Sequence, residues 1–346
     1  MNQHEHYMAR CLELAKRAAG HVAPNPMVGA VLVHEHRILG EGFHQKYGGP
    51  HAEVNCIQAV SAENRELISK SMLYVSLEPC AHHGKTPPCA DLILANGIPK
   101  VVIGCRDPFP LVNGKGIEKL VNGGVEVELG ILETECVELN RRFFTFHRQH
   151  RPYIILKWAQ SRDLKIANGD HSRVFISNEL SNRLVHRWRS EESAILVGTN
   201  TAKFDNPLLS VRLWNGPQPI RLVVDLDLKL PSGLHLMDRR QRTIVFNTIQ
   251  HEEDEMLSYY QVTTDTSLVH QILNALYHFK IQSVLVEGGA KLLQSFLDEG
   301  LWDEMRVITN ESISIEHGLP APDISSLSAS GDYDMDSDHI AIYRNE

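Results

Sequence analysis

Apolar and polar residues follow two periods along the first part of the chain. Apolar residues in 7–19 recur every three to four positions, which predicts an amphipathic helix. Short apolar runs predict strands at 28–33, 38–43, 73–77 and 101–104, and the intervening segments 51–60 and 89–95 favour helices. Strands that alternate with helices in this way predict a layered α/β domain.

A second series of short apolar runs follows residue 150. These runs predict strands at 153–159, 194–198, 220–225, 243–246 and 283–287, with helical stretches between several of them. The last strand leads into Gly288-Gly289 and a helix with an apolar face, and such a turn allows backbone N–H groups to approach a phosphate, although most Gly-Gly turns are only turns. The GxGxxG pattern of ordinary dinucleotide folds is absent from the sequence.

The end of the chain is acidic. Asp332, Asp334, Asp336 and Asp338 stand among small residues, so we expect 325–346 to be a solvated acidic loop, with one closing strand at 340–343.

The composition narrows the class of protein. A chain of 346 residues is long enough for two domains. A net charge of −9 gives no electrostatic help to a nucleic-acid partner, and no apolar run approaches the length of a membrane span. The N-terminus does not resemble a signal peptide, so we expect a cytoplasmic protein with reduced cysteines.

Cysteine and tryptophan are distributed unevenly. All 6 cysteines lie before residue 137, and all 4 tryptophans lie after residue 157. This shift predicts two domains, at 1–147 and 148–346, joined through the basic polar stretch 141–151.

Three short motifs in the first domain carry candidate metal chemistry. They are His51-Ala52-Glu53, Pro79-Cys80 and Pro88-Cys89. One imidazole and two thiolates can hold zinc and leave a fourth position open for water, which is the catalytic arrangement. A glutamate two residues after the histidine is typical of zinc deaminases, in which it moves protons and does not bind the metal. We therefore predict His51, Cys80 and Cys89 as zinc ligands and Glu53 as the general acid/base.

Other interpretations of these motifs remain open. A structural zinc site would need a fourth ligand, for which Cys56, His82, His83 and Cys105 are candidates, and the cysteines could also be inert core residues. The protein could then be a zinc-stabilised scaffold without catalysis. A nucleoside or tRNA deaminase with an appended module is another alternative, which the acidic charge disfavours for RNA.

The cysteine spacing points to one family. Eight residues separate Cys80 from Cys89, where the generic deaminase pattern has two, and the segment 79–89 resembles the deaminase of riboflavin biosynthesis. Asn-Pro-Met-Val-Gly at 25–29 and Gly-Phe-His at 42–44 match the same family. The resemblance implies a cytidine-deaminase-like α/β/α layered domain. It also implies substrate contacts from Asn25, His44, His82 and Lys85, and cationic groups in the inserted loop suit a ribose phosphate.

The second half resembles the reductase partner in the bifunctional riboflavin enzyme. The matching segments are 157–161, 195–198, Thr201 with 205–208, 286–289 and 295–297, so the resemblance covers nearly the whole chain. It implies a dihydrofolate-reductase-like α/β domain that uses NADPH. The implied cofactor contacts are Ala159, Val174, Thr201, Asp205, Gly289, Ala290, Lys291, Leu292, Leu293, Gln294 and Ser295. The implied substrate contacts are Ser172, Arg189, Leu209, Arg212 and Glu287.

The sequence departs from this family in one loop. Arg162-Asp163-Leu164 stands where an apolar residue, Asp and Gly are usual, and Val174 stands where an aromatic residue is usual. We expect either a weakened reductase or a remodelled loop at 167–176.

The resemblance implies a specific pair of reactions. The first is zinc-dependent hydrolytic deamination of 2,5-diamino-6-(5-phosphoribosylamino)pyrimidin-4-one. The second is NADPH-dependent reduction of the ribosyl group of 5-amino-6-(5-phosphoribosylamino)uracil to ribityl. The expected cofactors are Zn²⁺ and NADPH, and the expected assembly is a homo-oligomer that acts on small molecules and binds neither nucleic acid nor membrane.

Overall fold

The computed structural model of the chain describes residues 2–81, 87–170 and 172–345. The chain divides into two compact units, Met1–His150 and Arg151–Glu346. The stretch expected to be a polar junction is instead helix α6 (Arg141–Gln149). Its three phenylalanines are buried, and its other positions are basic or polar. The boundary expected after residue 147 falls inside this helix, and the units divide after His150.

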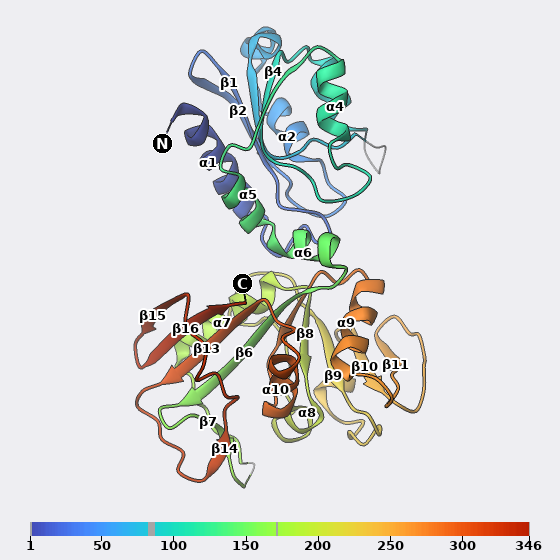
Figure 1. Ribbon diagram of the computed structural model, residues 1–346, viewed down its shortest axis with the longest axis vertical. Coiled ribbons are helices and arrows are strands. Elements are labelled where there is room, and N and C mark those ends of the chain that lie inside the picture. Colours follow the sequence, from blue (N-terminus) through green and yellow to red (C-terminus); the bar gives the residue numbers. More distant parts are fainter. Residues whose placement is uncertain (1, 82–86, 171, 346) are drawn as a thin grey trace. The chain divides into compact units, whose positions relative to one another are not determined.

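The first unit is built around one five-stranded sheet with the order β2-β1-β3-β4-β5. Strand β1 is antiparallel to β2 and β3, whereas β3, β4 and β5 are parallel. Its elements in chain order are α1 (Gln3–Lys16), β1 (Gly29–His34), β2 (Arg37–Phe43), α2 (Ala52–Gln58), a 3-10 helix (Ala62–Lys70), β3 (Met72–Leu77), α3 (Cys89–Ala95), β4 (Lys100–Cys105), α4 (Lys115–Asn122), β5 (Glu126–Leu129), α5 (Glu133–Leu139) and α6 (Figure 1).

Helices cover both faces of this sheet. Alternate strand residues such as Leu32, Leu73 and Ile103 face the core under α2, α3 and α4. Their neighbours Val31 and Val102 face a second core that α1, α5 and α6 complete. The period-2 alternation along each strand therefore produces the three layers that the sequence pattern predicted.

The second unit contains a nine-stranded sheet with the order β11-β10-β9-β8-β12-β6-β13-β16-β15. The strands from β11 to β13 run parallel, and β16 and β15 add an antiparallel edge. Its elements are β6 (Tyr153–Ser161), β7 (Lys165–Asn168), α7 (Glu179–Glu191), β8 (Ala194–Val197), α8 (Thr199–Asp205), β9 (Ile220–Val224), a 3-10 turn (His235–Met237), β10 (Thr243–Asn247), β11 (Leu257–Gln261), α9 (Leu268–His278), β12 (Ser283–Val286), α10 (Ala290–Asp298), β13 (Glu304–Asn310), β14 (Gly318–Pro320), β15 (Gly331–Met335) and β16 (Asp338–Arg344).

The largest core of this unit lies on one face of the sheet. Helices α9 and α10 bury Ile272, Leu293 and Phe296 against alternate residues of β6, β8 and β12. On the other face, α7 packs Val185 and Trp188 against β13 and β16. The carboxyl ends of β8 and β12 lead directly into α8 and α10, which brings the two helix N-termini to one edge of the sheet.

One expectation about the second unit was wrong, and one of its strands was not predicted. The acidic tail is not a solvated loop: Asp332 and Asp334 lie in β15, which pairs with β16 as a hairpin at the sheet edge, where exposed carboxylates remain in water. The sequence pattern also missed β13, because its buried residues include charged ones. Arg306 donates to Glu304 at 2.6 Å, so both charges are buried as a pair.

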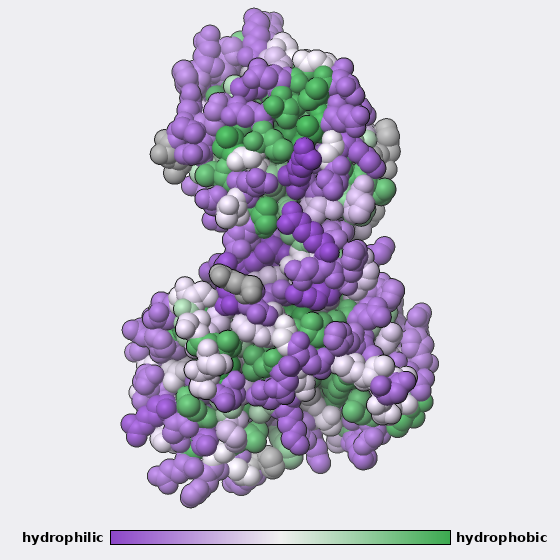
Figure 2. All heavy atoms as spheres, viewed as in Figure 1, coloured by the Kyte–Doolittle hydropathy of each residue, from purple (hydrophilic) through white to green (hydrophobic). Residues whose placement is uncertain are grey.

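The outer surface is mostly hydrophilic on the face visible in Figure 2, where apolar residues occupy smaller areas. Within the described ranges, no helix combines the length and apolar character that a membrane crossing requires.

Candidate functional site

The first zinc-ligand candidate stands at the beginning of α2. His51 is the residue before the helix, and Glu53 lies in its first turn. Helix α2 rests very closely on β2: a Cβ at Gly42 would lie 2.3 Å from the backbone nitrogen of Cys56 and 2.6 Å from the carbonyl oxygen of Ala52. Glycine at 42 therefore allows the contact that sets the position of His51 and Glu53.

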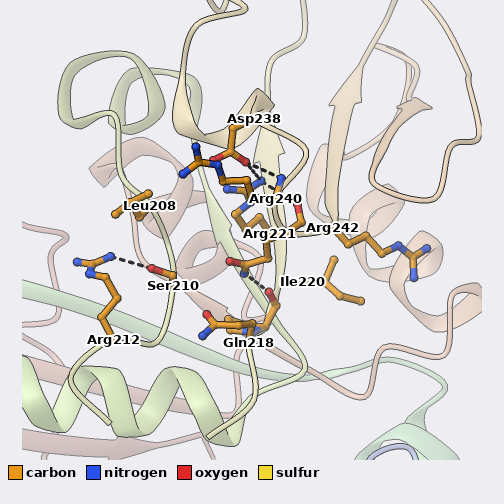
Figure 3. Close-up of a pocket in the computed structure, with 11 residues that line it drawn as sticks. Leu208, Ser210, Arg212, Gln218, Ile220, Arg221, Asp238, Arg240 and Arg242 are labelled. Carbon is orange, nitrogen blue, oxygen red and sulfur yellow. Dashed lines mark hydrogen bonds and ion pairs between the residues drawn. The ribbon is translucent and has the colours of Figure 1, made fainter. Parts of the chain in front are cut away.

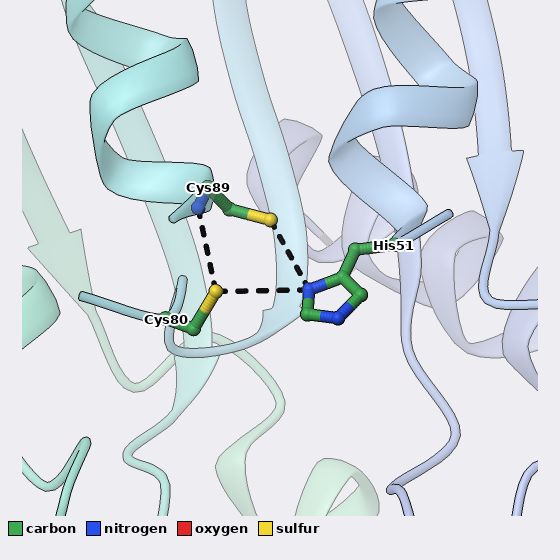
Figure 4. Close-up of side chains that lie close together, drawn as sticks. All are labelled: His51, Cys80 and Cys89. Carbon is green, nitrogen blue, oxygen red and sulfur yellow. Dashed lines mark hydrogen bonds between the residues drawn. The ribbon is translucent and has the colours of Figure 1, made fainter. Parts of the chain in front are cut away.

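The two cysteines reach the same point from another helix and a loop. Cys80 follows β3, and Cys89 is the first residue of α3. The Nδ1 atom of His51 lies 3.6 Å from the sulfur of Cys80 and 3.3 Å from the sulfur of Cys89 (Figure 4). Tetrahedral zinc with Zn–N near 2.0 Å and Zn–S near 2.3 Å would separate these atoms by about 3.5 Å, so the donor set fits zinc.

A fourth protein ligand is not found among the described residues. The group of His, Cys, Asp and Glu atoms within 4.8 Å of one another contains only His51, Cys80 and Cys89. The Cys56 thiol donates to the carbonyl of Gly40, and the Cys105 thiol donates to the carbonyl of Ser76. His82, His83 and Lys85 lie outside the described residues.

Glu53 is buried beside these ligands, with 3% of its surface exposed. Burial raises the pKa of its carboxyl group, and the negative charge of Cys80 raises it further. A carboxyl group with a raised pKa can hold a proton near neutral pH and return it, which is what a general acid/base requires.

Asn25 and His44 lie together near this centre. The His44 ring has a partner at each nitrogen. Its Nε2 atom lies 3.1 Å from the Asn25 amide nitrogen, and its Nδ1 atom lies 2.9 Å from the carbonyl oxygen of Pro50. The His44 ring stands edge-on to the His51 ring, with 5.4 Å between centroids. Burial lowers the pKa of His44, so its imidazole is neutral at pH 7 and can hydrogen-bond a polar ring.

The sequence analysis missed Glu78, which fixes the loop that carries Cys80. Its buried carboxylate accepts hydrogen bonds from the backbone N–H groups of Asp107, Gly114, Gly116 and Ile117, at 2.9–3.3 Å. A Cβ at Gly116 would lie 1.9 Å from the carbonyl oxygen of Pro79. An acidic residue between an apolar strand and Pro79-Cys80 could have been noticed in the sequence. Its role could not, because the backbone groups that it binds are more than 25 residues away in the sequence.

The second unit brings the expected cofactor residues to the N-termini of α8 and α10. The backbone N–H of Gly198 donates to the carbonyl of Gly288 at 2.8 Å. Gly288 has φ of 107°, and a Cβ at Gly289 would lie 3.2 Å from Oγ1 of Thr201. Two helix N-termini with two glycines between them offer backbone donors to a diphosphate, so these residues fit NADPH.

The α10 residues differ in what they can offer to a cofactor. The side chains of Leu292 and Leu293 are buried in the hydrophobic core, so their contacts to a cofactor could come only from the backbone. The amide of Gln294 donates to Asp298, and the hydroxyl of Ser295 donates to the carbonyl of Lys291. Lys291 is exposed, and Ala290 begins the helix.

Arg189 and Glu287 form a bidentate ion pair. Nε and one terminal nitrogen of Arg189 donate to the two carboxylate oxygens of Glu287 at 2.8 and 2.6 Å. Burial disfavours the charge on Glu287, but the charge and hydrogen bonds of Arg189 outweigh it and lower the pKa of Glu287 to about 2. Lys157 interacts electrostatically with both members of this pair, and burial lowers the pKa of its ammonium group. The sequence analysis did not identify Lys157 as a site residue.

Arg212 lies beyond this pair. Its backbone N–H donates to Nδ1 of His186 at 3.0 Å. Burial and the charges of Arg189 and Arg212 lower the pKa of His186 to about 4, so this histidine is neutral. The side chain of Leu209 belongs to a hydrophobic cluster, which leaves its backbone for any substrate contact.

The remaining reductase residues come from three separate segments. Asp205 ends α8, and burial raises the pKa of its carboxyl group. Ala159 is in β6 and packs near α7. Ser172 accepts a hydrogen bond from Asn168 at 2.9 Å, and Val174 is partly buried.

Comparisons with known proteins cover both units. Residues 1–105 match the cytidine and deoxycytidylate deaminase zinc-binding region, and residues 152–311 match the RibD C-terminal domain. The riboflavin biosynthesis protein RibD of Aquifex aeolicus is 41% identical over 90% of this chain and 89% of its own length. RibD of Escherichia coli is 34% identical over 88% of this chain and 87% of its own length.

Solved structures agree with these sequence matches. The deaminase/reductase of Thermotoga maritima superposes with a TM-score of 0.89 at 39% identity, and the match covers 99% of this chain and 98% of that chain. RibD of Acinetobacter baumannii gives a TM-score of 0.89 at 30% identity over the same shares.

These matches confirm the expected fold, the two activities and the cofactors zinc and NADPH. The first activity deaminates the diaminopyrimidinone ribotide, and the second reduces the ribosyl group of 5-amino-6-(5-phosphoribosylamino)uracil. The alternative of a nucleoside or tRNA deaminase with an inert module is not favoured, because the second unit matches the reductase domain. The chain belongs to the RibD family of bifunctional deaminase–reductases of riboflavin biosynthesis.

Proposed function

We propose that His51, Cys80 and Cys89 hold the zinc ion of the deaminase and that Glu53 transfers its protons. The observation that carries this proposal is the convergence of three donor atoms from distant segments within 4.8 Å, next to a buried carboxyl group. Zinc, when bound, supplies an acidified water as the nucleophile.

The protein residues around this centre have separate tasks. Glu53 accepts a proton from the attacking water and delivers it to the ring nitrogen. It then accepts the second proton, from the hydroxyl group now on the ring carbon, and delivers it to the departing amine. Asn25 and His44 hydrogen-bond the polar edge of the pyrimidinone and hold its amine-bearing carbon toward Glu53. His82 and Lys85 remain proposed substrate contacts from the sequence.

The reductase assignment follows the same logic. NADPH, when bound, supplies the hydride that reduces the ribosyl carbon. Thr201, Asp205 and the backbone of 289–295 hold the cofactor, with Ala159 and Val174 beside it. Glu287, Arg189, Ser172, Leu209 and Arg212 face the ribotide.

We also propose a cytoplasmic homo-oligomer. A reducing compartment keeps Cys80 and Cys89 available as thiolates. Large apolar side chains are exposed on the second unit, including Leu213 at 50% and Trp214 at 43%, and these suit burial against a second copy. Light scattering measures the molar mass of the protein in solution. A molar mass equal to that of one chain would reject the proposed homo-oligomer.

One incubation tests the paired chemistry. The full chain is mixed with the diaminopyrimidinone ribotide, with and without NADPH, and the products are identified by mass. We expect the deaminated ribotide without NADPH and the deaminated, reduced product with it. Unchanged substrate in both samples would reject the proposed function.

Zinc content tests the ligand set. The purified protein is expected to hold about one zinc per chain, because the three ligands form one site. Cys80→Ser and Cys89→Ser should each lose the metal, measured by elemental analysis. Cys56→Ser is the matched control, since its thiol bonds to Gly40. Full zinc retention in both ligand variants would contradict the assignment.

A further inference from the structure

The loop 209–218, which lies between α8 and β9, begins with a backbone conformation that needs support from outside. Leu209 has a φ of 47°, in the left-handed region that leucine rarely adopts. Backbone strain of this kind persists only where the surrounding contacts over-determine it. One such contact comes from α7, where Arg189 donates to the carbonyl oxygen of Ser210 at 3.4 Å. The residues that hold this loop therefore deserve separate roles from those that face a ligand.

His186 reaches the same loop from the middle of α7. Its ring is buried, with 5% of the residue exposed, and its Nδ1 atom accepts the backbone N–H of Arg212 at 3.0 Å. The ring nitrogen that accepts cannot carry a proton, so the neutral ring has its proton on Nε2. Three residues later, Arg189 binds both carboxylate oxygens of Glu287. Helix α7 therefore fixes both Glu287 and the loop 209–218.

Gln218 closes the base of the loop. Its amide oxygen accepts a hydrogen bond from the backbone N–H of Val211 at 2.7 Å, and its amide nitrogen donates to the carbonyl oxygen of Val211 at 2.9 Å. One side chain thus forms the pair of bonds that a residue of a neighbouring antiparallel strand would form. The backbone of Val211 is held in this way between Leu209 and Arg212.

Packing supports the loop on the side of α7. A Cβ at Gly216 would lie 2.5 Å from Cβ of Ser190, so the loop rests directly on that helix. Elsewhere a pocket of about 520 Å³ opens beside the loop, and Ser210, Arg212 and Gln218 contribute to its lining (Figure 3). Atoms that border an unfilled space lack packing contacts on that side. Hydrogen bonds from α7 and Gln218 must therefore resist displacement of the loop into this space.

We propose that His186 and Gln218 are positioning residues of the reductase, which hold the loop 209–218 in the conformation that receives the ribotide. The inference rests on the proposed function, which places Leu209 and Arg212 against that substrate. Both positioning residues act through hydrogen bonds to the backbone of the loop. Loss of either should affect binding of the ribotide and not of NADPH, whose expected phosphate contacts are at the N-termini of α8 and α10.

Steady-state kinetics of the full chain test the proposal. We expect His186→Phe to raise KM for 5-amino-6-(5-phosphoribosylamino)uracil by about 10-fold, the usual effect of leaving one hydrogen-bond donor without its partner. KM for NADPH should be unchanged, and kcat should change less than KM for the ribotide. His186→Asn should restore the parent value, because the Asn oxygen can accept the same N–H. Gln218→Ala, at an exposed position, should raise the same KM.

His278→Phe is the matched control. His278 is exposed and ends α9, which leads to the amino end of β12, whereas Glu287 and Gly289 follow the carboxyl end of that strand. This variant should keep the parent values of KM for both the ribotide and NADPH. Melting temperature and deamination by the same chains verify that each variant is folded.

The outcomes separate this inference from the function on which it rests. A parent value of KM for the ribotide in both His186→Phe and Gln218→Ala would overturn the inference alone. Equal increases of both KM values with a lower melting temperature would also overturn it, because that pattern reports a general loss of structure. If His186→Phe does not fold, Gln218→Ala decides the question. A parent chain that does not reduce the ribotide would instead contradict the proposed reductase function.

Discussion

Glu53 is almost fully buried next to three side chains that fit zinc, and its pKa is raised by that burial. Since we assign it proton transfer and not metal binding, Glu53→Gln should keep its zinc while deamination falls by about 100-fold or more. Zinc content and deamination rate are measured on one sample. The reductase activity of the same chain is the internal control, and a near-normal deamination rate would reject the role.

His186 makes the stability of the second unit depend on pH. Its folded pKa of about 4 lies below the value of about 6.5 in an unfolded chain, so the unfolded state binds more protons between these values. The stability of the unit therefore falls as pH is lowered from about 6.5 toward 4. Protonation would also remove the acceptor for the Arg212 N–H.

His186→Asn tests this dependence, because the Asn oxygen can accept the same hydrogen bond without titrating. We expect the loss of unfolding free energy between pH 7 and pH 4.5 to be smaller in the variant. All 4 tryptophans lie in the second unit, so urea unfolding followed by tryptophan fluorescence reports on that unit. Identical pH profiles for both proteins would contradict the assignment.

At the scale of elements, the deaminase site depends on how closely α2 approaches β2. A methyl group at position 42 would meet the backbone of Cys56 and Ala52, which cannot move without shifting the helix. Gly42→Ala should destabilise the first unit by about 1–3 kcal/mol and reduce deamination while reduction continues. Melting temperature and both activities are measured.

Gly331→Ala is the matched control for that substitution. Gly331 also lies in a strand, and nothing is within 4 Å of the Cβ position there. If Gly42→Ala melts and deaminates like Gly331→Ala, the close contact does not position His51 and Glu53.

At the scale of the whole molecule, each unit has its own sheet and its own hydrophobic cores. We therefore expect residues 1–150 to bind zinc and deaminate without NADPH, and residues 151–346 to bind NADPH and reduce the deaminated ribotide without zinc. Circular dichroism and the two assays measure this. A second fragment that folds but neither binds NADPH nor reduces the intermediate would contradict independent function.

The amino-acid sequence by itself determined the local chemistry and most regular elements. Strands such as β1 and β8 could be predicted because their apolar runs are uninterrupted. The residue types of His51, Cys80 and Cys89 predicted a zinc site, and the structure brings their donor atoms within 4.8 Å of one another. Short-range patterns carry this information because side-chain period and ligand type are properties of the local chain.

Tertiary structure decided what depends on distant partners. Strand β13 contains charges that only pairing inside the sheet makes tolerable, and β15 exists only because β16 lies beside it. Glu78 acquires its role from backbone groups more than 25 residues away. The difference between Arg189, which is paired with Glu287, and Arg212, for which the described residues supply no carboxylate partner, likewise needs coordinates. A local pattern specifies the charge of a residue but not the partner that neutralises it.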